Sequence, residues 1–330
     1  MKKYFLIILI LNSLQLHAQN IIIGFYNCEN FYDTTNQIKV IDEDFLPTSQ
    51  KKYTSKVFDI KSRHLANVIY NLGRIDNSNG IAMMGVAEIE NKDVLEKLIG
   101  EPILQKYHLK YLHFDSRDQR GVDVALIYNP SFFIPYQYKP YSLTDATHFN
   151  DYATRDILYV KGRLENQWVH ILVNHWPSRR GGAFLSNSKR IWASTVCKKI
   201  MDSVSLIDPG AKFIVMGDFN DNPNNSSIKK LGLSNPFLPL FNKGYGSIAF
   251  RDSWSLFDQI LLSRHWTEGN NNLINYKPII YTIPDMIETQ GKYQGYPKRT
   301  YDGDRFRGGY SDHFPVALIF KPILSGNTLK

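Results

Sequence analysis

Short apolar runs rich in Ile, Val, Phe and Tyr alternate along the chain with longer stretches in which apolar residues recur at helical spacing. The short runs predict β-strands at residues 21–26, 81–87, 122–128, 157–164, 168–174, 213–216, 256–262 and 314–320. The helical spacing predicts helices over residues 58–72 and 186–204. No long linker rich in Pro, Gly or Ser interrupts this alternation, which favours one α/β domain. Some breaks between strands are too short for a helix, so antiparallel hairpins must accompany any parallel pairs.

Two segments depart from this pattern. Residues 1–18 place Lys2 and Lys3 before a short apolar run and finish on Ala18, which predicts a cleaved signal peptide and a single domain over residues 19–330. We therefore expect a secreted protein, periplasmic or extracellular. No later stretch approaches the roughly 18 uninterrupted apolar residues of a membrane span, so stable membrane insertion is not expected. Residues 292–310 are dense in Tyr, Lys, Arg and Gly without a regular period and predict a long surface loop.

Composition narrows the class of protein. A chain of 330 residues that is 43% hydrophobic excludes disordered and collagen-like proteins. The 39 basic and 31 acidic residues give a net charge of +8, or 37 − 31 = +6 without Lys2 and Lys3, which favours polyanionic partners such as nucleic acid or an anionic membrane. Two cysteines, Cys28 and Cys197, exclude a dense disulfide framework; they are either two small buried residues or one bridge.

Acids, amides and histidines follow the apolar runs at the points where the predicted strands end. The two-residue period of a strand puts Asn27 and Glu29 on one face of the first strand. Each polar residue at a strand end, taken singly, has an ordinary structural explanation, such as a solvated strand end for Glu88 or an Asx turn at Asp218. Polar side chains at the ends of several strands converge on one rim of a sheet, and the full set is Asn27, Glu88, His175, Asp218, Asn220, Asp258, Asp312 and His313.

This ordered set, with GDFN at 217–220 and SDH at 311–313, resembles the endonuclease/exonuclease/phosphatase superfamily of deoxyribonuclease I-like enzymes. The resemblance spans most of the chain after residue 18. It implies a four-layered α/β sandwich, with two mixed β-sheets packed face to face and helices outside. It places the active site at the rim where strand ends from both sheets meet.

The resemblance also implies roles for these residues. Glu88 is the strongest candidate for a metal ligand, with Asn27 beside it and Asp312 as a second carboxylate. Such oxygen donors suit Mg²⁺, with Mn²⁺ or Ca²⁺ as alternatives, and no Cys/His cluster with zinc spacing is present. The expected catalytic residues are His175, Asp218, Asn220, Asp258 and His313, with Asp258 orienting His313. The sequence leaves open which histidine is the acid and which the base.

Three arginines are candidates for binding substrate. Arg155 looks like the phosphate-contacting arginine of the family, although an ion pair with Asp156 or Asp151 would also explain it. Arg179 follows His175, and Arg299 lies in the basic and aromatic segment before Asp312. Alternating cations and aromatic rings there can hold phosphates and stack on bases.

The sequence therefore predicts a secreted, Mg²⁺-dependent phosphodiesterase. The leading hypothesis is a nuclease that hydrolyses DNA, with RNA as an alternative substrate, to 5′-phosphate ends by in-line attack of water with histidine acid/base help. The resemblance associates His175 with general DNA cleavage, because abasic-site repair members carry asparagine at that position. The alternatives are a sphingomyelinase-type or inositol-phosphate phosphoesterase of the same superfamily, or a noncatalytic binding module. No obligate protein partner is expected.

Overall fold

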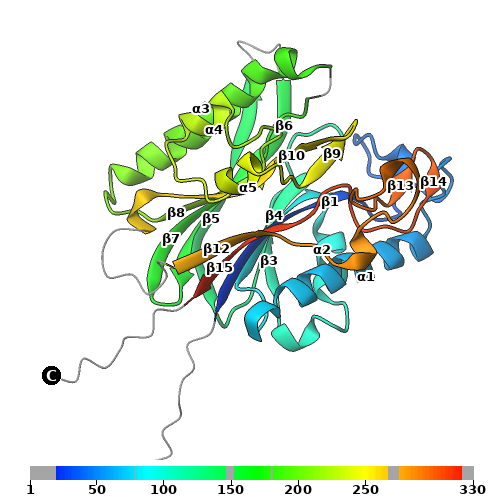
Figure 1. The fold of residues 1–330 in the computed structure, drawn as a ribbon, viewed down its shortest axis with the longest axis horizontal. Helices are drawn as coiled ribbons and strands as arrows, with labels where there is room; N and C mark the ends of the chain where they lie inside the picture. Colours follow the sequence, from blue (N-terminus) through cyan, green and yellow to red (C-terminus); the bar gives the residue numbers. More distant parts are fainter. Residues whose placement is uncertain (1–19, 78, 146–151, 180, 267–274, 322–330) are drawn as a thin grey trace, which may run out of the picture.

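The computed structural model describes residues 20–77, 79–145, 152–179, 181–266 and 275–321. The predicted signal peptide at residues 1–18 lies outside the described residues. Figure 1 shows two β-sheets stacked against each other, with α1 and α2 on one side and α3 and α4 on the other. These are the two mixed sheets with outer helices that the sequence predicts, so the predicted fold class is confirmed.

The first sheet has six strands, and its central parallel pair follows from a helical crossover. Helix α1 (Ser55–Leu72) connects β1 to β2, and helix α2 (Lys92–Ile99) follows β2. The other neighbours in this sheet are antiparallel. The strand order is β12 (Asn275–Ile280), β15 (Val316–Lys321), β1 (Ile21–Phe31), β2 (Met83–Ile89), β4 (Asp123–Tyr128) and β3 (Lys110–His113).

The second sheet has five strands and repeats this plan. Its one parallel pair, β7 with β8, is joined through helix α3 (Ala183–Ser205), and α4 (Ser226–Lys230) packs against α3. The strand order is β11 (Asp258–Leu262), β8 (Phe213–Asp218), β7 (Gln167–His175), β6 (Tyr152–Leu164) and β5 (Phe133–Asp145). The remaining described elements besides 3₁₀ turns are α5 (Leu238–Asn242), the ribbon β9 (Ile248–Phe250) with β10 (Ser253–Ser255), and the ribbon β13 (Tyr301–Asp302) with β14 (Arg305–Phe306).

Apolar side chains fill three layers of core. The central layer lies between the sheets, where Gly85 of β2 lets them approach, because a Cβ there would lie 2.6 Å from the sulfur of Met216 in β8. One outer core lies under α1 and α2, and the other lies under α3. Cys28 belongs to the first outer core and Cys197 to the second, and both thiols are free and buried. The structure therefore shows two separate buried cysteines and no disulfide bridge between them.

The predicted strands and helices coincide with β1, β2, β4, β6, β7, β8, β11, β15, α1 and α3, with ends that differ by a few residues. Strands β5 and β12 were not predicted, because Pro135, Pro140 and Pro278 interrupt their apolar pattern. The segment 292–310 is only partly the predicted surface loop. It contains the ribbon of β13 and β14, and its Tyr301 and Tyr310 are buried in the core.

Candidate active site

The first two strands end in β-bulges that aim acidic side chains. Glu29, Asn30 and Glu88 have positive φ angles of 49°, 51° and 59°. The register between β1 and β2 shifts after Asn27, and that between β2 and β4 shifts between Ala87 and Ile89. A bulge breaks the two-residue alternation of a strand and redirects the side chains that follow.

One sequence expectation is wrong because of this bulge. Asn27 and Glu29 do not share a face. The Asn27 amide donates from Nδ2 to Asp218 Oδ2 of the second sheet at 3.1 Å. The Glu29 carboxylate instead accepts from the backbone N–H of Thr300 at 2.7 Å and lies 3.9 Å from Lys61 Nζ of α1.

Glu88 faces the second sheet from the end of β2. Its Oε2 accepts the backbone N–H of Asn30 at 2.8 Å, which fixes the carboxylate. Its Oε1 lies 3.9 Å from His175 Nε2, and the side chain is partly exposed to solvent. A carboxylate held in this way at a strand end, with one oxygen turned toward the neighbouring sheet, can bind a cation without rearrangement.

The second sheet brings its three polar residues together through its register. His175 of β7 pairs with Asp218 of β8, and Asp218 pairs with Asp258 of β11. Gly217 allows the close approach of β7, because a Cβ there would lie 2.4 Å from the Asn174 carbonyl oxygen. Three strand ends thereby deliver an imidazole and two carboxylates side by side, as the sequence predicts.

His313, just before β15, is held by an acid. Its Nδ1 lies 2.7 Å from Asp258 Oδ2, which also accepts from the Ser247 hydroxyl at 2.5 Å. Its Nε2 lies 4.0 Å from Asp218 Oδ2. Burial alone would lower the pKa of His313, but the Asp258, Asp218 and Asp312 carboxylates raise it well above 6.5. His313 therefore carries a proton at neutral pH, and Asp258 orients it as the resemblance implies.

His175 meets the same acid from the other side. Its Nε2 lies 3.6 Å from Asp218 Oδ2, whereas its buried Nδ1 has no hydrogen-bond partner among the described residues. Burial, together with the positive charges of Arg155 and Arg120, lowers the pKa of His175 well below 6.5. His175 is therefore neutral at neutral pH.

Asp218 is the meeting point of these groups. Its Oδ1 accepts the backbone N–H of Asn220 at 2.9 Å, so the Asx turn that could explain this motif is present within the site. The Asn220 amide donates to the Trp176 carbonyl at 3.0 Å and ties the turn to β7. Burial and the Asp258 charge raise the pKa of Asp218 to about 6, against the opposing effect of His313.

Asp312 belongs to a chain of charges that sequence reasoning did not identify. Arg299 donates to Asp312 Oδ2 at 2.6 Å and lies 3.4 Å from Glu29 Oε1. Burial alone would raise the pKa of Asp312, but His313 and Arg299 hold it below the usual value. Burial and Asp312 raise the pKa of Glu29 to about 7, against the opposing charge of Lys61. Lys61, only 1% exposed, donates to Thr300 Oγ1 at 2.6 Å.

The signal for Lys61 was present in the sequence. It lies four residues before Leu65, seven before Val68 and eleven before Leu72, on the apolar stripe of α1. A lysine in such a stripe must find polar partners when the helix packs.

Two of the predicted substrate-binding arginines, Arg155 and Arg179, form hydrogen bonds within the protein. Arg155, 4% exposed, donates to the Trp176 carbonyl at 2.8 Å and to Asp118 Oδ2 at 3.1 Å, not to Asp156; Asp151 lies outside the described residues. Arg179 donates to the Asn220 carbonyl at 2.8 Å and to Asp221 at 3.0 Å. Both arginines hold the backbone of the site, and their contact with phosphate stays a prediction.

The residues at the rim fit an oxygen-bound divalent cation. Glu88 and Asp312 are carboxylates, and the Asn27 side-chain oxygen, which among the described residues accepts only the Glu29 N–H at 2.9 Å, keeps a second lone pair. Two carboxylates and water suit Mg²⁺. Ligand atoms of Asp218, Asp258 and His313 also lie within 4.8 Å of one another, but His313 Nδ1 is hydrogen-bonded to Asp258.

Comparison with known proteins identifies the family of the chain. A profile of the Endonuclease/Exonuclease/phosphatase family matches residues 22–321, nearly all of the described chain. The chain belongs to this family. Its members are typically metal-dependent phosphoesterases, and the fold described above is that of the family. The resemblance stated from GDFN, SDH and the earlier Asn and Glu is thus confirmed.

Solved structures with this family fold are distant in sequence. A mannosyl-6-phosphatase of Bacteroides thetaiotaomicron is 14% identical, with a TM-score of 0.55 over 92% of this chain and 100% of that one. A truncated TDP2 of Caenorhabditis elegans is 13% identical, with a TM-score of 0.55 over 92% and 98%. The human Nocturnin catalytic domain, which carries a sulfate anion, is 13% identical, with a TM-score of 0.55 over 92% and 95%. No curated protein sequence matched.

The remaining observations concern membrane spans and the contacts of the predicted residues. Within the described ranges, no helix combines the length and apolar character needed to cross a membrane. Sequence reasoning did not identify Glu29, Lys61 and Ser247, which contact Arg299, the loop residue Thr300 and Asp258, respectively.

Proposed function

We propose that this family member is a secreted, Mg²⁺-dependent phosphodiesterase that hydrolyses nucleic acid. One observation carries the proposal. A single oxygen, Asp218 Oδ2, lies within 4.0 Å of Nε2 of both histidines, one of them cationic and the other neutral. Opposite protonation states around one carboxylate suit a reaction in which protons move while negative charge builds up on phosphate.

The cofactor would be held at the rim of the first sheet. Glu88 and Asp312, with Asn27 beside them, are the residues that would bind Mg²⁺, and the ion would neutralise charge on the nonbridging phosphate oxygens. The Asn30 N–H binds one oxygen of Glu88, and Arg299 binds one oxygen of Asp312, so both carboxylates keep a fixed orientation. The exchange of Mg²⁺ for Mn²⁺ is expected to preserve activity because both take oxygen ligands.

The protein's own side chains would handle the water and the phosphate. Asp218 is the proton acceptor for the attacking water, since its pKa of about 6 lies near neutrality. Asn220 and Asn27 hold Asp218 in place through N–H donors at 2.9 and 3.1 Å. Neutral His175, with two acids near Nε2, carries its proton there and directs it toward Asp218. Cationic His313 presents its own Nε2–H to a phosphate oxygen.

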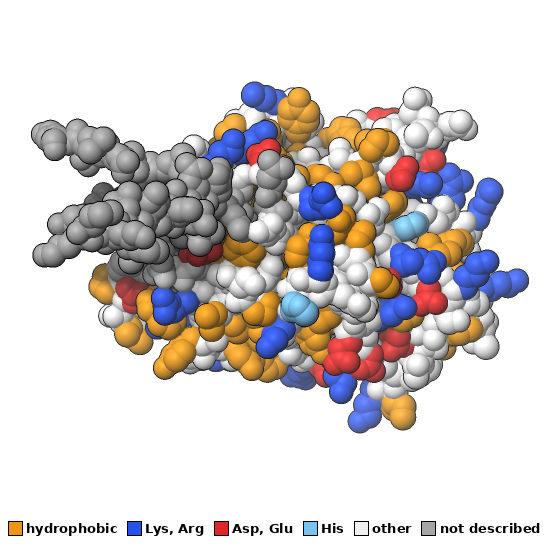
Figure 2. All heavy atoms as spheres, turned by 90° about the horizontal axis from the view of Figure 1, so that it is seen from below, with side chains coloured by type: hydrophobic (Ala, Val, Ile, Leu, Met, Phe, Trp, Pro, Cys, Tyr) orange, Lys and Arg blue, Asp and Glu red, His pale blue; other side chains and the backbone are white. Residues whose placement is uncertain are grey.

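The net charge of +8 supports a polyanionic substrate. A second candidate, a phosphomonoesterase for sugar phosphates, is favoured by a different observation. Arg179 and Arg299, expected to form a positive surface, are each paired with an acid. In Figure 2, Lys and Arg side chains are scattered among acidic and apolar ones on the face shown and form no continuous basic surface. The fold similarity to a mannosyl-6-phosphatase agrees with this candidate.

Hydrolysis assays separate the two candidates. We expect the purified protein to nick plasmid DNA and to cleave bis-p-nitrophenyl phosphate with Mg²⁺, and to lose both activities in EDTA. Glu88→Ala should lose at least about 100-fold, whereas Asp202→Ala, an exposed acid near the C-terminal end of α3, should retain activity. Cleavage of monoesters alone would replace the leading candidate with the second. Activity that survives EDTA would contradict the mechanism.

Secretion is tested separately. Export through residues 1–18 predicts that the protein recovered from the periplasm or medium of its host begins at residue 19. N-terminal sequencing measures this. Recovery only inside the cell with Met1 or Lys2 first would contradict it.

A further inference from the structure

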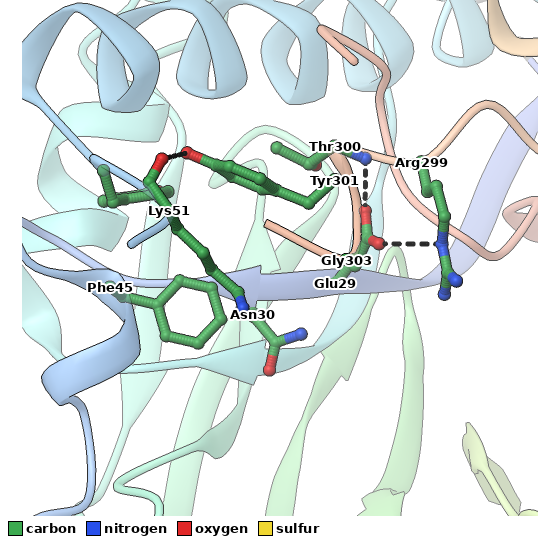
Figure 3. A pocket seen from close by; sticks show the side chains of 9 residues that line it. Glu29, Asn30, Phe45, Lys51, Arg299, Thr300, Tyr301 and Gly303 are labelled. Atoms are coloured by element: carbon green, nitrogen blue, oxygen red, sulfur yellow. Dashed lines mark hydrogen bonds and ion pairs between the residues drawn. The ribbon is translucent and has the colours of Figure 1, made fainter. Parts of the chain in front are cut away.

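A small pocket adjoins the proposed catalytic site on the side of Asp312. Its volume is about 180 Å³, and it is lined by Glu29, Asn30, Phe45, Lys51, Tyr53, Arg299, Thr300, Tyr301 and Gly303. Two of its residues also belong to the site. Asn30 donates its backbone N–H to Glu88, and Arg299 joins Glu29 to Asp312. Figure 3 shows Lys51 running across this pocket toward Asn30, with Phe45 on one side and Glu29 and Arg299 on the other.

The far wall of the pocket is rigidly held. The Glu29 carboxylate accepts the Thr300 N–H at 2.7 Å, and buried Lys61 ties the Thr300 hydroxyl to helix α1 at 2.6 Å. The Tyr301 hydroxyl donates to the Lys51 carbonyl at 3.2 Å and closes the pocket on the other side. A pocket held on one side by buried hydrogen bonds and on the other by a partly buried one is preformed for its ligand.

The size of the pocket limits the ligand to one ring. A protein cavity of about 150 Å³ accepts a benzene molecule, whereas sites for larger ligands start at about 300 Å³. At about 180 Å³, the pocket accommodates a single five- or six-membered ring with its substituents. It does not accommodate a stacked pair of nucleotides.

The residues that line the pocket favour a ligand with hydroxyl groups over an aromatic base or a second anion. Phe45 stacks on Tyr32 at 4.3 Å with one face, and Lys51 Nζ lies 5.9 Å from the ring centre. Tyr53 is fully buried and Tyr301 is only 8% exposed, so neither ring offers an open face for a base to stack on. The cations of the pocket are already balanced by acids, Lys51 by Asp304 at 2.9 Å and Arg299 by Asp312 at 2.6 Å, which disfavours a second anion. A carboxylate acceptor beside ammonium and guanidinium donors matches a ring with several hydroxyls.

We propose that this pocket binds the single sugar ring that carries the scissile phosphate. The inference rests on the proposed function, because it assigns the sugar side of the same phosphoester substrate. Two sources share this chemistry, namely the ribose of a nucleotide, with its 2′- and 3′-hydroxyls, and the hexose of a sugar phosphate. In either case Lys51 and Glu29 contact ring hydroxyls while the phosphate lies at Glu88 and Asp312.

The test compares esters with and without a sugar. The substrates are p-nitrophenyl uridine 5′-phosphate, mannose 6-phosphate, and the sugar-free bis-p-nitrophenyl phosphate and p-nitrophenyl phosphate. We expect Lys51→Met to raise KM for a sugar-bearing ester about tenfold relative to the sugar-free ester of the same class, the loss of one hydrogen bond from a charged donor. Lys51→Arg, which keeps a donor, should restore most of the difference. Lys52→Met, an exposed neighbour that does not line the pocket, is the matched control.

Each outcome decides a point. A relative rise in KM confined to the uridine ester identifies the ribose, and one confined to mannose 6-phosphate identifies the hexose. An unchanged ratio in Lys51→Met, with the thermal unfolding midpoint of the wild type, overturns this inference and leaves the proposed function standing. Hydrolysis of no ester at all by the wild type contradicts the proposed function, and with it this inference.

Discussion

The two histidines of the site reach the same carboxylate from opposite sheets, yet their surroundings differ. His313, which precedes β15 of the first sheet, has Asp258 on Nδ1 at 2.7 Å. His175, which ends β7 of the second sheet, has no partner on Nδ1 among the described residues, and the arginines Arg155 and Arg120 lie close enough to repel a proton. Both side chains are almost fully buried.

The difference shows that equal burial does not decide the charge of a histidine. Burial acts against the proton in both cases, and the neighbouring charges then separate them. Three carboxylates keep His313 protonated, whereas two guanidinium groups reinforce the neutral state of His175. Two groups with separated pKa values around one acid are what acid and base chemistry at a single pH requires.

Removal of the shared acid should cause the largest loss. Asp218→Asn keeps the size of the side chain but removes the charge that both histidines face. We expect kcat/KM for phosphodiester hydrolysis to fall about 10³- to 10⁴-fold, because the proposed proton acceptor is lost. Asp202→Asn, an exposed acid on α3, is the control and should not change activity. A loss of less than tenfold would show that the histidines work without Asp218.

Removal of the partner of one histidine should have a smaller and pH-dependent effect. Asp258→Asn takes away the carboxylate that holds the His313 proton, so the pKa of His313 should fall. We expect kcat/KM to drop about 100-fold, with a greater loss at pH 9 than at pH 6, because His313 then loses its proton earlier. The measurement is the pH profile of kcat/KM. An equal loss at every pH would mean that Asp258 acts only through packing.

The sequence predicts the parts of this site that local sequence patterns determine. The strand period and the order of the strands place His175, Asp218 and Asp258 at one rim, because neighbouring strands of a sheet end together. The amino-acid sequence alone therefore predicts that these three side chains converge. The same holds for the two mixed sheets, since short breaks and helical crossovers are visible in the apolar pattern.

The features that were missed depend on backbone turns and distant packing. The direction of Glu29 follows from a bulge with positive φ at Glu29 and Asn30; asparagine adopts such a φ more readily than most residues, but a glutamate gives no signal of it. The burial of Arg155 depends on Asp118, 37 residues away, and on the Trp176 carbonyl. Such contacts are set by how loops cross the rim, which local propensity does not encode.

Removal of a positive charge near His175 should lower activity less than either of the changes above. Arg120→Gln removes one of the positive charges that disfavour protonation of His175, so the pKa of His175 should rise. Arg120 is partly exposed, and we expect a loss of no more than about fivefold in kcat/KM, seen at acidic pH, where His175 begins to take up a proton. Arg117→Gln, an exposed arginine on the same loop, is the control. A loss greater at alkaline pH would contradict a neutral His175.

The difference between the two histidines should also appear in the stability of the metal-free protein. The pKa of His313 is raised on folding, so its stabilisation is fully present below pH 6.5 and is lost as the pH rises through the folded pKa. The pKa of His175 is lowered on folding, so stability is lost as the pH falls below 6.5, where the unfolded chain takes up the proton first. A tenfold difference in proton affinity is worth about 1.4 kcal/mol.

Urea unfolding in EDTA at pH 5, 6.5 and 8 measures this smallest effect. Relative to wild type, His175→Gln should gain stability between pH 6.5 and pH 5, because it no longer resists protonation. His313→Gln should lose stability between pH 8 and pH 6.5, because it no longer holds a proton that the unfolded chain lacks. Since the two variants are compared with the same parent, effects common to burial or packing shift every pH equally. If both curves moved in the same direction, the two histidines would carry the same charge, and the separation of roles around Asp218 would be wrong.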